Sequence, residues 1–268
     1  MSRPIVALLS DFGTRDHYVG TMKGVLLGIC PDAALVDISH EVPPHDVLSG
    51  ALELAAAYRY FPKATVFLVV VDPGVGSARR GIAAEAGDYK FVAPDNGVLT
   101  AVFREARPKR IAELTERKYA RATVSKTFEG RDRFAPAAGW LAKGISLNSL
   151  GRSISDPQLI DIPAPTIDAT AIRGQVLRVD RFGNLITNVD RAAFDRFARD
   201  GAVSIRIADH DVARVVNTYA EAPLRSVCAL FGSTDHLEVA VNGGSAAETL
   251  GLTRGASITI HHELKIDN

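Results

Sequence analysis

An acid and two cations follow a β-branched run near residue 70, and their order suggests a catalytic loop. The run 66–71 reads Val-Phe-Leu-Val-Val-Val, and Asp72, a Pro-Gly-Val-Gly turn, Arg79 and Arg80 come after it. In an open α/β sheet, ligands bind beyond the carboxyl ends of the strands, so we expect Asp72 and Arg79 to face one crevice. Asp-Pro-Gly is also ordinary turn chemistry. Taken alone, the segment leaves a plain turn and a catalytic edge equally open.

The glycines of this loop do not match the known phosphate-binding loops. The spacing of Gly74 and Gly76 does not fit the dinucleotide fingerprint, and no Gly-Lys-Ser or Gly-Lys-Thr follows them. The sequence therefore favours a ligand that is not held by its phosphates.

A second set of candidate substrate-binding residues lies in the last third of the chain. Asp180, Phe182 and Asn184 surround one predicted hairpin bend. An asparagine side chain offers the paired donor and acceptor that an adenine edge requires, and an aromatic ring can stack on a base. A plain hairpin turn is an equally good interpretation of this bend. A later polar loop between two predicted strands adds Phe231, Ser233 and Asn242.

The composition indicates a globular protein with a small-molecule partner. The chain has 268 residues, of which 47% are hydrophobic, enough to bury a sizeable core in one large domain or two modest ones. Lys+Arg and Asp+Glu both number 31, so the formal net charge is zero. Because no basic field is present, we expect neither nucleic acid nor a membrane as a partner.

Metal chemistry and secretion are not expected either. Cys30 and Cys228 have no metal-ligand spacing and are too few for a disulfide framework, and the 7 histidines show no HExxH-like spacing. The first ten residues contain too short an apolar run for a signal peptide, and no stretch approaches membrane-spanning length. We expect a cytoplasmic protein without a metal site.

The elements that must position the catalytic loop alternate between strands and helices. This alternation predicts an α/β domain over residues 1–155, with a mostly parallel sheet flanked by helices. Three of its strands end in acidic residues, which we expect to line one edge of the sheet. The expected strands are 5–9, 34–38, 65–71, 82–86 and 90–93, and the expected helices are 18–30, 46–60, 99–105 and 135–143.

The pattern changes in the second half of the chain. Residues 156–173 are rich in Pro, Asp, Ser and Thr and are expected to form a linker. Short alternating strands then predict a small antiparallel β-barrel domain over residues 174–268. The expected strands are 174–180, 185–189, 203–207, 212–215, 228–231, 237–241 and 256–261.

Several ordered motifs together resemble the S-adenosyl-L-methionine hydrolase (adenosine-forming) family, the hydroxide adenosyltransferases related to S-adenosylmethionine fluorinases and chlorinases. The resemblance covers nearly the whole chain. Its motifs are Ser10-Asp-Phe-Gly-Thr, Ile38-Ser-His-Glu-Val-Pro-Pro, Val71-Asp-Pro-Gly-Val-Gly-Ser-Ala-Arg, Pro94-Asp-Asn-Gly, Phe128-Glu-Gly-Arg-Asp-Arg-Phe-Ala-Pro, Phe182-Gly-Asn-Leu-Ile-Thr-Asn and Ala240-Val-Asn-Gly-Gly-Ser-Ala.

The resemblance implies a homotrimer that holds S-adenosylmethionine between neighbouring subunits, as a substrate and without a further cofactor. It also implies that the acid at Asp11 holds the ribose hydroxyls, and that Asp180 and Asn184 meet the methionine and adenine moieties. Ser233 and Asn242 lie in a loop that resembles the remainder of that pocket.

Asp72 and Arg79 match the first two members of the Asp-Arg-His triad of these hydrolases, but the third position departs from the pattern. The family usually reads Phe-His-Gly-Arg-Asp where this chain has Phe-Glu129-Gly-Arg-Asp. We expect Glu129 to serve as the second ligand of the attacking water or as its proton acceptor, beside Asp72 and Arg79.

The implied reaction is hydrolysis of S-adenosyl-L-methionine to adenosine and L-methionine by attack of water at the ribose 5′ carbon. One alternative is chlorinase-like halide transfer, because the small Gly130 leaves room near the nucleophile. A carboxylate at Asp72 would repel a halide ion at close range, which favours water. A second alternative is a protein that binds S-adenosylmethionine or adenosine without catalysis.

Overall fold

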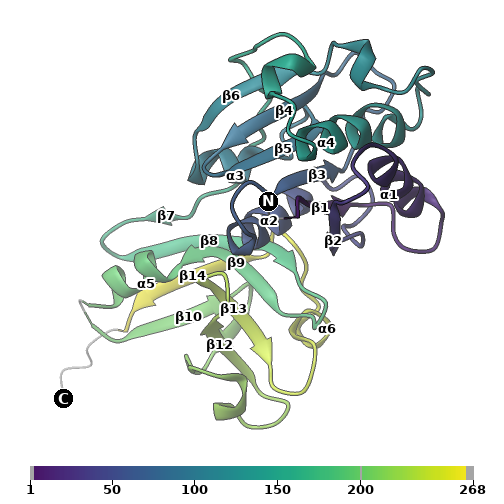
Figure 1. Ribbon diagram of the computed structural model, residues 1–268. Coiled ribbons are helices and arrows are strands. Elements are labelled where there is room, and N and C mark those ends of the chain that lie inside the picture. The colour runs from purple at the N-terminus through teal and green to yellow at the C-terminus, as the bar shows by residue number, and fades with distance from the viewer. Residues whose placement is uncertain (1–2, 200, 264–268) are drawn as a thin grey trace, which may run out of the picture. The chain divides into compact units, whose positions relative to one another are not determined.

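The computed structural model describes residues 3–199 and 201–263 (Figure 1). The chain divides into two compact units, Met1–Ile162 and Pro163–Asn268. The boundary falls inside the segment 156–173, and the role of this segment as a linker stays a prediction. Among the described residues, no helix has both the length and the apolar character needed to cross a membrane.

The first unit is built on a six-stranded sheet with the order β2-β1-β3-β5-β4-β6. Strands β1, β2, β3 and β5 run parallel, whereas β4 pairs antiparallel with β5 and with β6. The predicted mostly parallel sheet is therefore confirmed. Its strands are β1 (Ile5–Ser10), β2 (Ala34–Ser39), β3 (Val66–Val70), β4 (Gly81–Ala86), β5 (Tyr89–Pro94) and β6 (Pro108–Glu113).

Helices cover both faces of this sheet, which explains why its central strands are nearly continuous apolar runs. Successive side chains of a strand point to opposite faces, so β1 and β3 each supply residues to two separate cores. Residues of α1 and α4 enter one core, and residues of α2 and α3 enter the other. These helices are α1 (Tyr18–Ile29), α2 (Val47–Ala57), α3 (Thr100–Glu105) and α4 (Ala135–Ala142).

Helix α2 begins where the sequence predicts, because Asp46 caps its first turn. The Asp46 carboxylate accepts hydrogen bonds from the backbone N–H of Ser49 at 3.0 Å and from its hydroxyl at 2.9 Å. The helix ends at Ala57, earlier than expected, and the next three residues form a 3₁₀ turn, η1 (Tyr58–Tyr60).

The second unit is an eight-stranded antiparallel, barrel-like sheet, as predicted. Its path is β11-β10-β14-β8-β9-β13-β12, and β7 pairs with β8 off this path. The long strand β8 pairs with β14 through its first half and with β9 through its second half. The strands are β7 (Thr166–Ile167), β8 (Ala171–Val179), β9 (Leu185–Asp190), β10 (Val203–Ile207), β11 (His210–Val212), β12 (Val227–Phe231), β13 (His236–Val241) and β14 (Ser257–His262).

Several elements of this unit differ from the sequence-based expectations. The prediction of a strand over 212–215 was wrong. Ala208 has a positive φ in a tight turn after β10, so β11 pairs with β10 from His210 onward and ends at Val212. Two helices, α5 (Arg191–Ala198) and α6 (Ala246–Leu250), were not expected. Both are short, and a stripe of a few apolar residues on so short a helix is a weak sequence signal.

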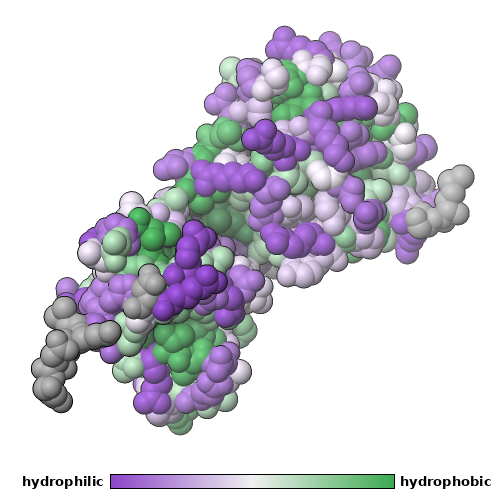
Figure 2. All heavy atoms as spheres, turned by 90° about the vertical axis from the view of Figure 1, so that its left-hand side faces the viewer, coloured by the Kyte–Doolittle hydropathy of each residue, from purple (hydrophilic) through white to green (hydrophobic). Residues whose placement is uncertain are grey.

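The surface mixes polar and apolar side chains. On the face shown in Figure 2, hydrophilic residues are interspersed with hydrophobic ones, and neither kind covers a whole unit. Apolar atoms contribute more than half of an ordinary protein surface, so single exposed apolar side chains need no special explanation. Among the larger ones, Phe182 is 77% exposed, which leaves its ring available to a ligand.

Candidate active site

The carboxyl ends of three parallel strands meet at one edge of the first sheet. An acidic residue closely follows each of these strands, as the sequence predicts: Asp11 after β1, Glu41 after β2 and Asp72 after β3. The chain passes from β1 to β2 on one side and then returns to β3 on the other side of β1. Such a reversal opens a crevice between the strand ends, and this is where open α/β sheets bind ligands.

Asp72 and Arg79 form a buried, two-pronged ion pair at this edge. Arg79 Nε donates to Asp72 Oδ1 at 2.9 Å, and Arg79 Nη2 donates to Asp72 Oδ2. The Asp72 side chain is 5% exposed and the Arg79 side chain is 10% exposed. The guanidinium also lies over the Phe134 ring, 5.1 Å from its centroid. Both prongs are therefore fixed in direction as well as in distance.

Glu129 joins this pair, so the structure brings together all three residues predicted to be catalytic. Its Oε2 forms an ion pair with Arg79 Nη2 at 2.7 Å and accepts a hydrogen bond from Arg133 Nη1 at 3.2 Å. The Glu129 side chain is 10% exposed. Asp72, Arg79, Glu129 and Arg133 thus form a chain of alternating charge, which we call the four-residue cluster.

A glycine allows the two segments of the cluster to approach each other. Gly76 has a φ of +79°, and a Cβ at this position would collide with the carbonyl oxygen of Lys126. Only glycine satisfies both the backbone conformation and the space. The loop that carries Arg79 can therefore lie directly against the segment that leads into Glu129.

A wide helical turn presents Glu129 and Arg133. Residues Gly130–Phe134 form a π-helical turn, closed by a hydrogen bond from the N–H of Ala135 to the carbonyl of Gly130. Pro136 has no N–H to offer to the carbonyl of Asp132, and its ring crowds that oxygen in a regular helix. The Asp132 carbonyl instead accepts the N–H of Arg121 at 2.9 Å. The proline thus explains the irregular turn, a feature often found at functional sites.

The small size of Gly130 serves packing. A Cβ there would lie 3.1 Å from Met22 Sδ and 3.4 Å from Val70 Cγ1, both in the core. The room at this position, which suggested halide transfer from the sequence, is therefore filled by α1 and β3.

Burial and charge act in opposite directions on Asp72. Burial raises the pKa of its carboxyl group and the nearby Glu129 adds to this rise, while the hydrogen bond and charge of Arg79 oppose it. The net pKa lies above the ordinary aspartate value. For Arg79, burial alone would lower the pKa, but Asp72 and Glu129 outweigh it and raise the pKa. The guanidinium therefore stays charged while it serves two carboxylates.

In the second unit, the structure brings together Asp180 and Asn184. The amide nitrogen of the Asn184 side chain donates to Asp180 Oδ2 at 2.9 Å, and the backbone N–H groups of Phe182 and Asn184 donate to Asp180 Oδ1. Asp180 therefore shapes the bend between β8 and β9, consistent with the hairpin interpretation. Asn184 is buried, whereas the ring of Phe182 extends outward.

The other three predicted substrate residues lie around the β12–β13 hairpin and its exit. The Phe231 ring packs against Phe194 at 5.2 Å between centroids, with Arg191 4.4 Å above it. Ser233 is exposed in the turn. The side-chain amide of Asn242 donates to the carbonyl of Ala222 at 2.7 Å, which fixes the loop before β12.

Comparison with known proteins decides the family. The N-terminal domain of the SAM hydroxide adenosyltransferases, where SAM is S-adenosyl-L-methionine, matches residues 6–151, and the C-terminal domain matches residues 174–259. The chain belongs to the SAM hydroxide adenosyltransferase family.

Relatives of the chain include enzymes with two different names. The chain is 39% identical to the (R)-S-adenosyl-L-methionine hydrolase of Salinispora tropica, over 96% of this chain and 97% of that protein. It is 29% identical to a fluorinase of Actinoplanes, again over 96% and 97%. A crystal structure of an uncharacterized conserved protein from Thermotoga maritima superposes with a TM-score of 0.89 at 36% identity, covering 96% of this chain and all of that one.

Sequence reasoning missed several residues that hold the sheet edge of this adenosyltransferase-family domain. The Asn96 side chain donates to the carbonyl of Val71 at 2.8 Å and so fixes the backbone that precedes Asp72. Ser10 Oγ is hydrogen-bonded to His40 Nδ1 at 2.7 Å, and His40 Nε2 to Asp37 Oδ1 at 2.9 Å. The Asn-Gly turn and the position of His40 after a strand were the available signals.

Asp11 keeps one carboxylate oxygen for other contacts. Its Oδ2 accepts the backbone N–H of His45 at 2.8 Å, and the side chain is only half-buried. No hydrogen bond from another described residue reaches its Oδ1. His45 has a φ of +67°, an uncommon conformation for a residue other than glycine. The loop after β2 is therefore tied to the acid that follows β1.

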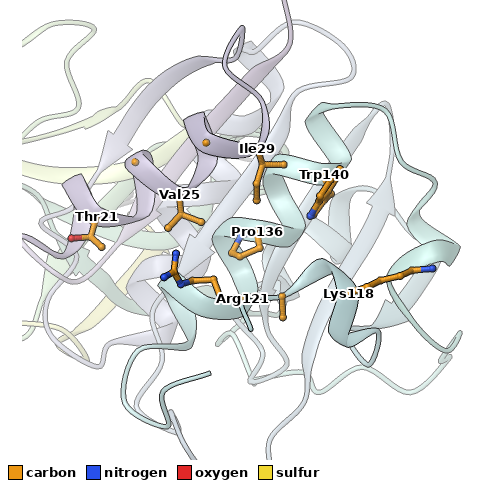
Figure 3. A pocket seen from close by; sticks show the side chains of 10 residues that line it. Thr21, Val25, Ile29, Lys118, Arg121, Pro136 and Trp140 are labelled. Atoms are coloured by element: carbon orange, nitrogen blue, oxygen red, sulfur yellow. The ribbon is translucent and has the colours of Figure 1, made fainter. Parts of the chain in front are cut away.

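A separate groove of the first unit lies away from these residues. Its volume is about 630 Å³, and α1, α4 and the turn η2 (Arg117–Tyr119) contribute to its walls (Figure 3). Val25, Ile29, Pro136 and Trp140 give it a largely apolar lining. None of the predicted site residues lines it. Within the part of the chain that the structure describes, no group of three or more His, Cys, Asp or Glu residues is placed to hold a metal ion.

Proposed function

We propose that this protein hydrolyses S-adenosyl-L-methionine to adenosine and L-methionine by attack of water on the 5′ carbon of the ribose. The observation that carries the proposal is the buried cluster of Asp72, Arg79 and Glu129 at the carboxyl edge of the sheet. It occurs in a chain that matches both domains of the SAM hydroxide adenosyltransferases.

The chemistry requires little beyond a well-placed water. The water oxygen forms a bond to C5′ while the C5′–sulfur bond breaks, and the electron pair of that bond stays on sulfur as the neutral thioether of methionine. One proton leaves the water for a base and then for solvent. Because the sulfonium leaves without acid assistance, alignment is the main task, and positioning alone can contribute about 7–11 kcal/mol.

The hydrogen bonds suggest a division of work between the two carboxylates. Both oxygens of Asp72 are engaged by Arg79, so Asp72 holds the guanidinium and orients the site. Both arginine bonds to Glu129 reach Oε2, and among the described residues no hydrogen bond to Oε1 is found. Glu129 Oε1 is therefore free to bind the water and accept its proton.

The residues proposed to recognise the substrate include an acid and an aromatic ring. Asp11 would bind the ribose hydroxyls through its Oδ1, and Phe182 would stack on the base. The remaining residues proposed to contact adenine or methionine are Asp180, Asn184, Phe231, Ser233 and Asn242.

We further propose a homotrimer with the substrate at the subunit interface. Light scattering after size-exclusion chromatography tests this assembly, and the expected mass is three times 28.7 kDa.

Incubation of the pure protein with S-adenosyl-L-methionine, with and without chloride or fluoride, tests the function. We expect adenosine and L-methionine in equal amounts, independent of halide. A halogenated deoxyadenosine product that requires the halide would instead indicate a halide transferase. Tight binding of the substrate without release of methionine would indicate a binding protein and contradict the proposal.

A further inference from the structure

Arg133 is fixed at two points beside the proposed base. Its Nη1 donates to Glu129 Oε2 at 3.2 Å, and its Nη2 donates to the carbonyl of Leu114 at 2.8 Å. Leu114 directly follows β6, so the guanidinium is tied to the rigid sheet. The Arg133 side chain is 23% exposed, and it reaches Glu129 from the π-helical turn that begins directly after Glu129.

Two arginines converge on one oxygen of Glu129. Arg79 Nη2 lies 2.7 Å from Glu129 Oε2, and Arg133 contacts the same oxygen. A carboxylate held from two directions through one oxygen cannot rotate freely, and its other oxygen points in a defined direction. A general base needs this property, because its acceptor atom must stay within hydrogen-bond reach of the proton that it removes.

Arg133 also completes the charge balance of the cluster. Asp72 and Glu129 are two buried carboxylates that share Arg79. Buried like charges disfavour each other unless cations offset them. With Arg133, the cluster contains two acids and two arginines, so Glu129 does not depend on Arg79 alone.

We propose that Arg133 is a positioning residue that acts specifically on a glutamate at position 129. It holds Oε2 so that Oε1 faces the water that attacks the substrate, and this inference rests on the hydrolysis proposed above. A histidine at position 129 would have no carboxylate to accept the N–H of Arg133. The guanidinium would also disfavour the imidazolium that forms when a histidine takes up the proton. Arg133 therefore assists a glutamate and hinders a histidine.

Four proteins test this: the parent, Arg133→Met, Glu129→His and the double variant. We expect Arg133→Met to lower kcat by up to about 100-fold in the parent, the loss that a misplaced active group can cause, with little change in KM. In the Glu129→His background, the same substitution should leave kcat unchanged or raise it. Arg133→Lys should recover part of the loss, since it keeps the charge but not the second anchor. Arg59→Met is the control, because Arg59 forms an exposed pair with Glu105 at 2.6 Å.

The pattern across the two backgrounds separates positioning from folding. If Arg133 were merely structural, Arg133→Met would lower kcat by the same factor in the parent and in the Glu129→His background, and this result would overturn the inference. If Arg133→Met does not fold, Arg133→Lys in both backgrounds provides the same comparison. A parent that releases no methionine refutes the proposed function and this inference with it, whereas an active parent with equal effects refutes this inference alone.

Discussion

At the scale of single residues, the cluster around Arg79 binds its two carboxylates differently, and we propose different tasks for them. Both carboxylate oxygens of Asp72 accept hydrogen bonds from Arg79, while Arg79 and Arg133 contact only one oxygen of Glu129. We propose that Glu129 takes the place of the histidine that the family resemblance implies. In this proposal, the difference in hydrogen bonding separates Asp72, which holds the site, from Glu129, which accepts the proton.

Substitution of Glu129 tests this assignment. Glu129→Ala should lower kcat about 100-fold or more, because general-base assistance typically contributes about 10²–10⁴-fold. Glu129→His should keep more activity than Glu129→Ala, since imidazole can also accept a proton. Steady-state release of methionine measures both variants. An alanine variant as fast as the parent would rule out Glu129 as the base.

The raised pKa of Asp72 predicts the acidic side of the activity profile. Burial raises this pKa and Glu129 raises it further, against the effect of Arg79, so the carboxyl group takes up a proton above its ordinary value of 3.8. Protonation releases the Arg79 fork, and activity should fall as the pH decreases through that raised pKa. The pH dependence of kcat/KM, combined with carboxyl ¹³C NMR of Asp72, measures it. A titration of Asp72 below pH 3.8 would contradict the prediction.

That the residues proposed to be catalytic lie together could be expected from the sequence, but their hydrogen bonding could not. Asp72 and Arg79 stand at a strand end and across a glycine turn, and the strand-end rule places them at the sheet edge. Glu129 came from the resemblance. Nothing in the spacing indicated that Asn96 would brace Val71, because an asparagine in an Asn-Gly turn is explained by the turn itself.

At the scale of elements, apolar periodicity identified the central strands and the helices that cover them. Strands β1 and β3 are apolar on both faces, and their runs stand out in the sequence. Strand β6 was missed because Lys109 and Arg110 are exposed, and only its second half is apolar. The π-helical turn before α4 was also unpredictable, since it depends on a proline that redirects the Asp132 carbonyl to Arg121.

The close approach at Gly76 gives a prediction for the catalytic loop. Gly76→Ala places a Cβ against the Lys126 carbonyl, in a backbone conformation that alanine disfavours. We expect it to lower the free energy of unfolding by about 1–3 kcal/mol and to reduce kcat, because the loop must move away from Glu129. Denaturant unfolding and methionine release measure the two effects.

Gly144 provides the matched control for this substitution. It also has a positive φ, +103°, but nothing lies within 4 Å of a Cβ at that position. Gly144→Ala should therefore reduce stability through the backbone alone and leave kcat unchanged. Equal losses of activity at Gly76 and Gly144 would show that the contact with Lys126 is unimportant.

At the scale of the whole molecule, the architecture follows from the change of pattern along the chain. The first unit has the alternation of strands and helices that a parallel sheet requires, and the second has the short strands of an antiparallel barrel. The boundary was harder to place, because the short strand β7 and the start of β8 lie in a segment whose composition resembles a linker. Pairing with a neighbouring strand, which composition does not reveal, orders these residues.

The most direct test of the proposed function is the fate of the water oxygen. S-adenosyl-L-methionine is incubated with the pure protein in ¹⁸O-labelled water, and the products are analysed by mass spectrometry. Attack of water on the 5′ carbon predicts adenosine with one ¹⁸O atom in its 5′ hydroxyl group and unlabelled L-methionine. Adenosine without the label, or no adenosine at all, would contradict the mechanism.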